Sequence, residues 1–265
     1  MTQITKAFVL LSGGVDSTTN VGLAVNAWGA ENVEAVSVDY GQRHLKEIAS
    51  AEAVCSHYGI KHTVLKMSQQ PESMLTNASA EVPSISYSDI KGVSPTYVFF
   101  RNGQLLSLIA AHAHSVIEGL NKVTDAASMG LGDMYDGVIY FGAHAEDAAG
   151  WAYPDCTPEF IGAMANAIYI GTYFKVRLLT PLAFMNKTQV VTTGMALDVP
   201  YDLTWSCYKG EEYHCGECPT CRARHEAFCR AGVSDPTTYR VHPPVGFDSK
   251  AKVVVFDGDD DQVPY

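Results

Sequence analysis

The 265-residue sequence predicts an α/β protein: a parallel sheet with helices on both faces, followed by a small cysteine-rich C-terminal region. Three observations predict this fold class. Short apolar segments alternate with amphipathic helical segments, which is the pattern of parallel β-α units. A glycine-rich turn directly follows the first apolar segment. Four of the seven cysteines gather between residues 207 and 221, outside this alternation.

The first third of the chain predicts three strands and two helices. Residues 7–11 are a short, continuous apolar run, as is typical of a buried strand. The helix after the glycine-rich turn is expected to end at Gly29, and the next helix at Gly59. The expected strands are 7–11, 33–38 and 62–67, and the expected helices are 18–28 and 45–58.

The rest of the chain continues the alternation with longer connections. Residues 68–95 are rich in Ser, Pro and Asn and predict a long surface loop, and the polar segment 121–136 predicts an insert. A short apolar segment at 252–256 is typical of a strand and precedes an acidic tail. The remaining expected elements are helices at 104–120, 158–169 and 188–197 and strands at 137–142 and 176–182.

These elements divide the chain into three expected parts. A Rossmann-like α/β domain should cover residues 1–200, the cysteine region 201–235 should pack on it, and a C-terminal extension with the acidic tail should cover 236–265. The composition is 47% hydrophobic and 18% charged, which excludes a mainly disordered chain. No apolar run reaches the roughly 18 residues that cross a bilayer, and the N-terminal segment predicts a strand rather than a signal peptide. We expect no membrane partner.

Charge and cysteine usage narrow the class of partner. The 18 basic and 29 acidic residues give a net charge of −11, and a non-specific nucleic-acid binder needs an excess of Lys and Arg. Free nucleotides remain possible ligands, because backbone amides bind phosphate without net positive charge. An odd number of cysteines and no expected signal peptide argue against a disulfide framework. We therefore expect small-molecule partners and a cytoplasmic location.

The glycine-rich turn SGGVDS, residues 12–17, lies between a predicted strand and a predicted helix. Its backbone amides, its hydroxyl groups and the helix N-terminus together predict a cradle for phosphate or pyrophosphate. Asp16 would repel phosphate unless a magnesium ion bridges the two. The turn matches neither GxxxxGK[ST] nor GxGxxG. The competing interpretation is an ordinary strand–turn–helix with a capping side chain.

Cys207, Cys215, Cys218 and Cys221 have the spacing of a closed four-thiolate metal site. Two CxxC turns bring sulfurs close enough for tetrahedral zinc at about 2.3 Å, so we expect one structural zinc ion per chain. An iron–sulfur cluster is the main competing interpretation, and redox thiols are a weaker one. We expect the neighbouring His214 and His225 to lie on the surface or behind the ligands rather than to bind the ion.

The turn, extended to LLSGGVDST, resembles the pyrophosphate loop of the N-type ATP pyrophosphatases. Six further motifs in register narrow the resemblance over roughly residues 7–235. On these motifs the chain resembles the 7-cyano-7-deazaguanine synthase family of queuosine biosynthesis. The motifs, in chain order, are FVLLSGGVDSTT, SVDYGQRH, FFRN, YPDCTPEF, TPL, TWSCY and CGECPTCRAR.

This resemblance implies an adenine nucleotide alpha hydrolase-like fold and an ATP-dependent carbon–nitrogen ligase. It implies that 7-carboxy-7-deazaguanine and ammonia become 7-cyano-7-deazaguanine through adenylated intermediates. It also implies magnesium with ATP, structural zinc on the four cysteines, a cytoplasmic location and a homodimer. By motif match, the ATP site would comprise Leu11, Ser12, Gly13, Gly14, Val15, Asp16, Ser17, Thr18, Thr19, Asn20 and Val21.

Other candidate residues come from their places in the predicted elements. Asp39, Tyr40 and Gln42 follow a strand, where ligands bind in open α/β sheets. Arg101 and Asn102 would open a helix and could hold phosphate or substrate. Asp147, Asp155 and Glu159 could accept hydrogen bonds from a guanine-like edge, whereas Lys46 and Glu47 should belong to a solvated face. We expect catalysis from Ser12, Asp16 and Lys187, and nucleotide contacts also from Asp39, Gln42 and Arg101.

Departures from the family pattern leave open which compound is the final product of the reaction. Phe99 and Phe100 precede Arg101 where the family usually has Pro-Gly, and the 143–156 segment is longer than usual. Both should shape the substrate pocket, so a reaction that stops at 7-amido-7-deazaguanine is the first alternative. Another adenylating enzyme, such as a tRNA thiolase, is the second. A zinc-stabilised nucleotide-binding module without turnover is the third.

Overall fold

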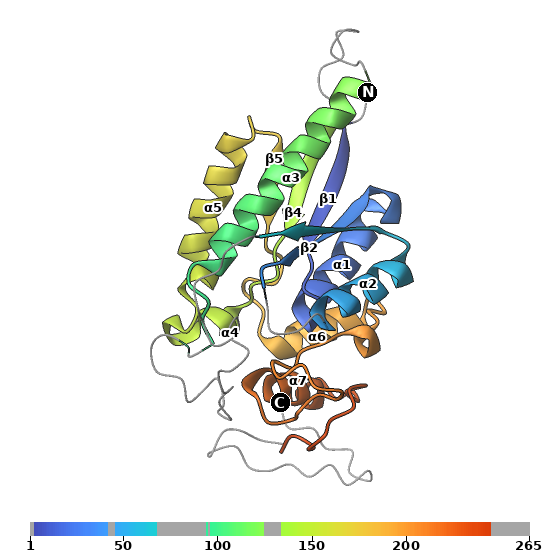
Figure 1. Ribbon diagram of the computed structural model, residues 1–265, viewed down its shortest axis with the longest axis vertical. Coiled ribbons are helices and arrows are strands. Elements are labelled where there is room, and N and C mark those ends of the chain that lie inside the picture. Colours follow the sequence, from blue (N-terminus) through green and yellow to red (C-terminus); the bar gives the residue numbers. More distant parts are fainter. Residues whose placement is uncertain (1–2, 42–45, 68–93, 95, 125–133, 245–265) are drawn as a thin grey trace.

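The computed structural model describes residues 3–41, 46–67, 94, 96–124 and 134–244. Its centre is a five-stranded parallel sheet with strand order β3-β2-β1-β4-β5 (Figure 1). The segment 252–256 and the acidic tail lie outside the described residues. The strands are β1 (Ile4–Leu10), β2 (Val33–Asp39), β3 (Lys61–Lys66), β4 (Tyr135–Tyr140) and β5 (Val176–Leu179).

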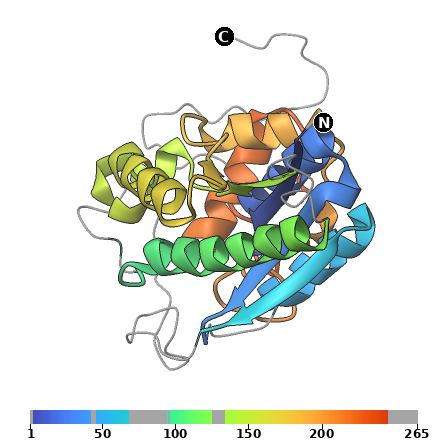
Figure 2. The ribbon, with the colours of Figure 1, turned by 90° about the horizontal axis from the view of Figure 1, so that it is seen from above.

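Helices cover both faces of the sheet, so the fold class predicted from the sequence is confirmed (Figure 2). Helices α1 and α2 pack on one face, and α3 and α5 pack on the other. Helices α6 and α7 pack beside α1 and form a third apolar cluster with it. The longer helices are α1 (Val15–Trp28), α2 (Lys46–Tyr58), α3 (Arg101–Val123), α5 (Pro158–Gly171), α6 (Lys187–Met195) and α7 (Pro219–Arg230).

The sheet has one apolar core on each face, because the side chains of the central strand β1 point alternately to the two faces. In β1, Phe8 packs with α3 and α5, whereas Ala7 and Val9 pack with α1 and α2, because successive side chains of a strand point to opposite faces. Residue Ala7 pairs with Val33 on β2 and with Val138 on β4. Strand β1 is therefore buried on both faces and both edges, as its continuous apolar sequence predicts.

The strand order places a crevice beside the glycine-rich turn. The chain runs outward from β1 through β2 to β3, then returns to add β4 on the other side of β1. The connections after β1 and β4 therefore diverge at the carboxyl edge of the sheet, which is where open α/β sheets bind ligands. The turn at residues 11–14, the end of β2 and the end of β4 all reach this edge.

The structure differs from the sequence expectations mainly at element ends. Helix α1 begins at Val15, three residues early, so Asp16 and Ser17 lie in its first turn. Helix α3 runs from Arg101 to Val123, into the expected 121–136 insert, of which residues 125–133 lie outside the described part. Helix α7 starts at Pro219 inside the cysteine region, where the sequence pattern predicted no helix. Pro at the first helical position explains this start.

A short helix, α4 (Ala145–Ala148), and two single 3-10 turns occupy the segment after β4. His144 caps α4, and Asp147 completes the capping box by accepting from the His144 amide. The extended 143–156 segment is therefore ordered around the edge of the sheet. None of the helices in the described part of the chain combines the length and apolar composition needed to cross a membrane.

Candidate active site

A cavity of ≈ 300 Å³ lies at the carboxyl edge of the sheet. One wall is the glycine-rich turn, a second comes from the ends of β2 and β4 with the start of α3, and a third comes from the cysteine region. Residues from all three parts face the same space. The site residues predicted from sequence that line it are Leu11, Ser12, Gly14, Val15, Asp16, Ser17, Tyr40, Arg101, Asn102, Asp147 and Lys187.

The glycine-rich turn depends on Gly13. Its φ is 76°, and a Cβ there would lie 2.5 Å from the carbonyl oxygen of Glu47 and 2.9 Å from the amide of Ala51. Only glycine combines this backbone with this approach. On the other side, the Trp205 amide donates to the Gly13 carbonyl at 2.8 Å. The turn is thus held between α2 and the cysteine region.

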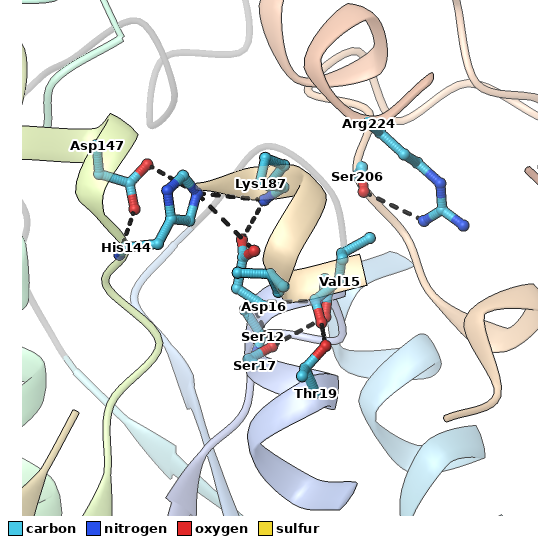
Figure 3. Close-up of polar contacts among 12 residues, drawn as sticks. Ser12, Val15, Asp16, Ser17, Thr19, His144, Asp147, Lys187, Ser206 and Arg224 are labelled. Atoms are coloured by element: carbon cyan, nitrogen blue, oxygen red, sulfur yellow. Dashed lines mark hydrogen bonds and ion pairs between the residues drawn. The ribbon is translucent and has the colours of Figure 1, made fainter. Parts of the chain in front are cut away.

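Hydroxyl groups fix the remainder of the turn. The Ser12 amide donates to the Ser17 hydroxyl at 3.2 Å, and the Ser12 and Ser17 hydroxyl oxygens lie 3.1 Å apart (Figure 3). The Ser17 hydroxyl donates to the Gly14 carbonyl at 3.2 Å. These contacts leave Ser12, Gly14 and Asp16 at the cavity surface beside the N-terminus of α1, whose partial positive charge favours an anion.

Two carboxylates, a lysine and a histidine meet beside this turn (Figure 3). The Lys187 ammonium donates to an Asp16 carboxylate oxygen. His144 Nε2 lies 3.8 Å from Asp16 Oδ1 and 3.4 Å from Asp147 Oδ1. Among the described residues, Asp16 Oδ1 is buried and accepts no hydrogen bond. This oxygen faces the other charged side chains and can still accept a hydrogen bond.

Burial and neighbouring charge act in opposite senses on the two carboxylates. Burial raises the pKa of Asp16, but attraction to Lys187 and His144 outweighs it, so the pKa lies below its ordinary value. Burial raises the pKa of Asp147, and the nearby Asp16 charge adds to the rise. The cluster therefore keeps Asp16 ionised at neutral pH. A bound cation would also favour the ionised form of Asp147.

Several predicted nucleotide contacts lie away from the cavity. Thr18, Thr19, Asn20 and Val21 are buried in α1 and do not line it. The Thr19 hydroxyl hydrogen-bonds the Val15 carbonyl and lies 2.8 Å from the Tyr201 hydroxyl, which is a packing role.

The remaining candidate residues, from the strand ends and from the YPDCTPEF segment, lie in different surroundings. Asp39 does not line the cavity and accepts from the Gly41 amide at 3.2 Å. Gln42 lies outside the described residues. Asp155 is buried and accepts from the Asn102 amide at 3.0 Å, which positions the start of α3, and Glu159 is exposed on α5.

The prediction that Glu47 belongs to a solvated face is wrong. Glu47 lines the cavity from the first turn of α2, and burial raises its pKa to about 7 despite the Arg101 charge. Lys46, its neighbour, lies 4.3 Å over the Trp205 ring and donates to the Glu212 carbonyl at 3.1 Å. A charge pair at the start of a helix resembles a solvated face in sequence, and only packing against other elements distinguishes the two.

Arg101 and the YPDC segment form the wall away from the glycine-rich turn. Arg101 donates to the Tyr40 hydroxyl at 3.3 Å. The Tyr153 hydroxyl lies 2.6 Å from that of Thr96. Burial raises the pKa of Cys156, so its thiol is protonated at neutral pH. This wall presents a guanidinium group, hydroxyls and a neutral thiol to the cavity.

Phe99 and Phe100 were expected to shape the substrate pocket, but neither lines the cavity. Both side chains are exposed, and Phe100 precedes α3 in the left-handed region with φ 53°. Its ring packs edge-on against Phe160 of α5 at 5.8 Å between centroids. The extended 143–156 segment does shape the cavity, through His144, Asp147 and Tyr153 among others.

The four cysteines converge as their spacing predicts. Their sulfurs all lie within 4.8 Å of one another, and all four side chains are buried. His214 and His225 are also buried rather than on the surface. His214 Nε2 accepts from the Ser206 amide at 3.0 Å, and its ring packs against that of Trp205 with 4.1 Å between centroids and a tilt of 40°. This histidine therefore supports the segment that carries Trp205 to the cavity.

Some residues that line the cavity lie in no sequence pattern strong enough to predict them as site residues. His144 follows the end of β4, a position that the rule for ligand sites in open sheets could have indicated. Trp205, Ser206, Tyr208 and Arg224 come from the cysteine region, whose return to the glycine-rich turn is a tertiary contact without a local sequence pattern.

With this geometry established, comparison with known proteins identifies the family. Residues 6–232 match the family model described as "Queuosine biosynthesis protein QueC". The chain belongs to the QueC family. The resemblance predicted from the sequence motifs is confirmed, and the match covers the sheet, the glycine-rich turn and the cysteine region together.

Several curated relatives of the QueC chain carry the name 7-cyano-7-deazaguanine synthase. The chain is 43% identical to a 7-cyano-7-deazaguanine synthase of Thermoplasma volcanium, over 90% of this chain and 92% of the relative. It is 40% identical to the synthase of Caldicellulosiruptor bescii, over 89% of this chain and 98% of the relative. Among solved structures, a U34-tRNA thiolase of Methanococcus maripaludis matches with 15% identity and a TM-score of 0.37, over 76% of this chain and 58% of that one.

We predict that Glu47→Gln becomes more stable relative to the QueC wild type as pH rises. The carboxyl of Glu47 has a raised pKa in the folded state, so between pH 4.5 and 7 the folded chain binds the proton that the unfolded chain has lost. Wild-type stability therefore falls as pH rises through this window, by about 2 to 3 kcal/mol from pH 5 to pH 8.

Urea unfolding of both proteins at pH 5 and pH 8 measures this difference. Glu52→Gln on the exposed side of the same helix is the matched control and should show no comparable pH-dependent gain. An equal response of the two variants would mean that Glu47 is solvated after all.

Proposed function

We propose that the protein converts 7-carboxy-7-deazaguanine and ammonia to 7-cyano-7-deazaguanine, with ATP cleaved to AMP and pyrophosphate. Membership of the QueC family assigns it to the carbon–nitrogen ligases of queuosine biosynthesis. The observation that best supports this mechanism is the contact between the Asp16 carboxylate and the Lys187 ammonium at the glycine-rich turn. A protein that only bound nucleotide would not need a half-buried, ionised carboxylate beside the phosphate cradle.

The turn is suited to hold the pyrophosphate that leaves ATP. The Gly14 amide, the Ser12 hydroxyl and the N-terminus of α1 face the cavity together with the Lys187 ammonium. Attack of the substrate carboxylate on the α-phosphate forms an acyl adenylate and expels pyrophosphate, and positive groups fixed in advance stabilise the developing charge. Ammonia then displaces AMP to give the amide, and activation of the amide oxygen by a second ATP permits elimination to the nitrile.

Magnesium fits the carboxylates beside the turn. Asp16 Oδ1 is a buried oxygen without a hydrogen-bond partner in the described structure, and Asp147 faces the same group. Hard oxygen ligands of this kind suit Mg²⁺ carried with phosphate. When bound, the ion would neutralise charge on the phosphates. Lys187 holds Asp16 in place, and His144 holds Asp147 by its contact at 3.4 Å.

The opposite wall is suited to the deazaguanine acid. Arg101 is half-buried at the start of α3 and offers a guanidinium group to the substrate carboxylate, while Tyr40 holds that group in position. Since Cys156 stays protonated, it contributes shape and a weak polar contact rather than a nucleophile. The substrate would then present its carboxylate between Arg101 and the nucleotide.

We also propose a cytoplasmic homodimer without nucleic-acid partners.

Zinc is the metal we propose for the four cysteines. The tetrahedral geometry of zinc with bonds of about 2.3 Å requires sulfurs roughly 3.8 Å apart. The Cys215 and Cys221 sulfurs are 3.9 Å apart, and all four fall within 4.8 Å. Thiolates that bind different irons of a cluster lie farther apart than thiolates that share one ion. The observed spacing therefore favours one ion with a closed coordination shell.

We predict one zinc ion per chain, measured by elemental analysis of the purified protein. Cys218→Ser should lose the zinc and several kcal/mol of unfolding free energy, because structural zinc contributes directly to folding. Its residual folded fraction should bind ATP more weakly, since the Trp205 amide fixes Gly13. Cys229→Ser, on the same helix as Cys221 but outside the metal group, should keep its zinc. A zinc-free Cys218→Ser protein with wild-type stability and ATP affinity would contradict this assignment.

We predict that nucleotide turnover yields AMP and pyrophosphate and depends on Asp16. Asp16→Asn should lower kcat by about 100-fold or more, because it removes charge stabilisation of the leaving group while changing little volume. Asp39→Asn, on a neighbouring strand end outside the cavity, should retain most activity. Nucleotides are separated by anion-exchange chromatography and folding is followed by circular dichroism. ADP as the sole nucleotide product would refute the proposed chemistry.

We predict that the end product is the nitrile and that two AMP form for each nitrile. The residues that carry both activations are the same, and Phe99 and Phe100 lie away from the cavity, so the departures at these positions leave it intact. The measurement is mass spectrometry of the product, with AMP counted in parallel, under excess ATP and ammonium. Lasting accumulation of 7-amido-7-deazaguanine with one AMP per product would show that the reaction stops at the amide.

A further inference from the structure

Glu47 is an acidic side chain of the cavity to which the proposed reaction gives no role. It lies half-buried in the first turn of α2. Among the described residues, no hydrogen bond and no ion pair holds its carboxylate. A carboxylate removed from water is unfavourable unless a polar or charged group meets it. The position of Glu47 between the two ends of the proposed reaction indicates which ligand this group belongs to.

Glu47 lies between the phosphate cradle and the wall that would hold the substrate. Its backbone carbonyl oxygen approaches Gly13 so closely that a Cβ on Gly13 would lie 2.5 Å away. Its side chain lines the cavity and is attracted by the Arg101 guanidinium. An acyl adenylate joins these two places, because its phosphate belongs at the turn and its carbonyl group belongs beside Arg101. The carbonyl carbon that ammonia attacks would therefore lie close to the Glu47 carboxylate.

The groups around Glu47 leave it as the base on this wall. Arg101 from α3 is a permanent cation. Burial raises the pKa of Tyr40 at the end of β2, so its hydroxyl stays protonated at neutral pH. Tyr208 lines the cavity from the cysteine region, whereas Lys46, the neighbour of Glu47 on α2, does not line it.

The other acidic side chains that line the described cavity are engaged elsewhere or exposed. Asp16 contacts the Lys187 ammonium. Asp147 lies 3.4 Å from His144 and belongs to the same group of charges beside the glycine-rich turn. Glu146 is exposed to solvent. Glu47 is thus the acidic side chain that faces the substrate wall without a partner of its own.

We propose that Glu47 is the base of the ammonia step: its carboxylate binds ammonium, accepts one proton from it and so supplies ammonia beside the acyl adenylate. The inference rests on the proposed function and adds to it a residue for the step that follows adenylation.

Atoms and charge balance in this step. One proton of ammonium passes to the Glu47 carboxylate, and the lone pair of the resulting ammonia forms the C–N bond to the acyl carbon. The bond between that carbon and the AMP oxygen breaks, and AMP leaves with the electron pair. A second nitrogen proton passes to the leaving phosphate oxygen. The products are the amide, AMP and protonated Glu47, which then returns its proton to solvent.

The surroundings of Glu47 suit this task. Burial raises its pKa to about 7. A carboxylate with this pKa accepts a proton from ammonium at a smaller free-energy cost than an ordinary carboxylate, and it is still partly ionised at neutral pH. Its negative charge also attracts the ammonium cation into a cavity that already holds the cations Arg101 and Lys187.

The test compares Glu47→Gln with the wild type in two half-reactions. Adenylation alone is followed as exchange of labelled pyrophosphate into ATP, with 7-carboxy-7-deazaguanine present and ammonium absent. This exchange needs no base, so the variant should remain close to the wild type. The amide and nitrile formed from ammonium at pH 7, counted together by mass spectrometry, should fall by about 100-fold, which is a usual contribution of a general base.

Hydroxylamine distinguishes a missing base from a disturbed site. It is a weaker base than ammonia, so at pH 7 it is mostly neutral and can attack without first losing a proton to Glu47. Hydroxamate formation by Glu47→Gln should therefore approach that of the wild type. The deficit with ammonia should shrink toward pH 9, where much of the ammonium has already lost its proton. Glu47→Asp keeps a shorter carboxylate and should retain part of the ammonia step.

Glu52→Gln, at an exposed position of α2, is the matched control and should keep both half-reactions. Circular dichroism verifies folding, and Glu47→Asp replaces Glu47→Gln in both measurements if the latter does not fold. Equal loss of exchange and of ammonia turnover would make Glu47 a binding or structural residue and overturn the proposal. Undiminished ammonia turnover in Glu47→Gln at pH 7 would overturn it as well. A wild type without pyrophosphate exchange would instead contradict the proposed function.

Discussion

Gly13 is the point on which the cavity depends, because three parts of the chain meet there within van der Waals distance. Helix α2 approaches so closely that a Cβ would collide with the Glu47 carbonyl oxygen, and the cysteine region donates the Trp205 amide to the Gly13 carbonyl. The turn is therefore not a flexible loop that closes on phosphate. Its amides are held in place before a ligand arrives, which is the condition for electrostatic stabilisation of a leaving group at low reorganisation cost.

The positions of the charged side chains in the cavity depend on this rigid backbone. Asp16 is carried on the first turn of α1, so its position is set by the same backbone that continues from the glycine-rich turn. A half-buried carboxylate is stabilised by a partner of opposite charge, and Lys187 from the start of α6 supplies it. On the other wall, burial of Glu47 outweighs the attraction of the Arg101 charge, and the pKa of Glu47 rises to about 7. The two carboxylates thus have opposite electrostatic environments within one cavity.

The sequence was sufficient for the features that local patterns encode. Alternation of apolar and amphipathic segments predicted the parallel sheet, and SGGVDS between a strand and a helix predicted the glycine-rich turn, which lines the cavity. Four cysteines with CxxC spacing predicted a metal group, and their sulfurs do converge. His144, Glu47 and Trp205 could not be found in this way. Each reaches the cavity through contacts between distant elements, so its sequence neighbourhood resembles that of an ordinary cap, a solvated charge or a core aromatic residue.

The same reasoning explains why the cysteine region helps to form the candidate active site, although none of the four grouped cysteines lines the cavity. His214, between Cys207 and Cys215 in sequence, accepts a hydrogen bond from the Ser206 amide and packs against the Trp205 ring. Arg224, buried on α7, donates to the Tyr201 carbonyl at 2.9 Å and pairs with the buried Asp235 at 3.1 Å. These contacts tie the segment 204–206 to the metal group on one side and to Gly13 on the other. A metal ion bound there would hold this segment, and with it the glycine-rich turn, in place without lining the cavity.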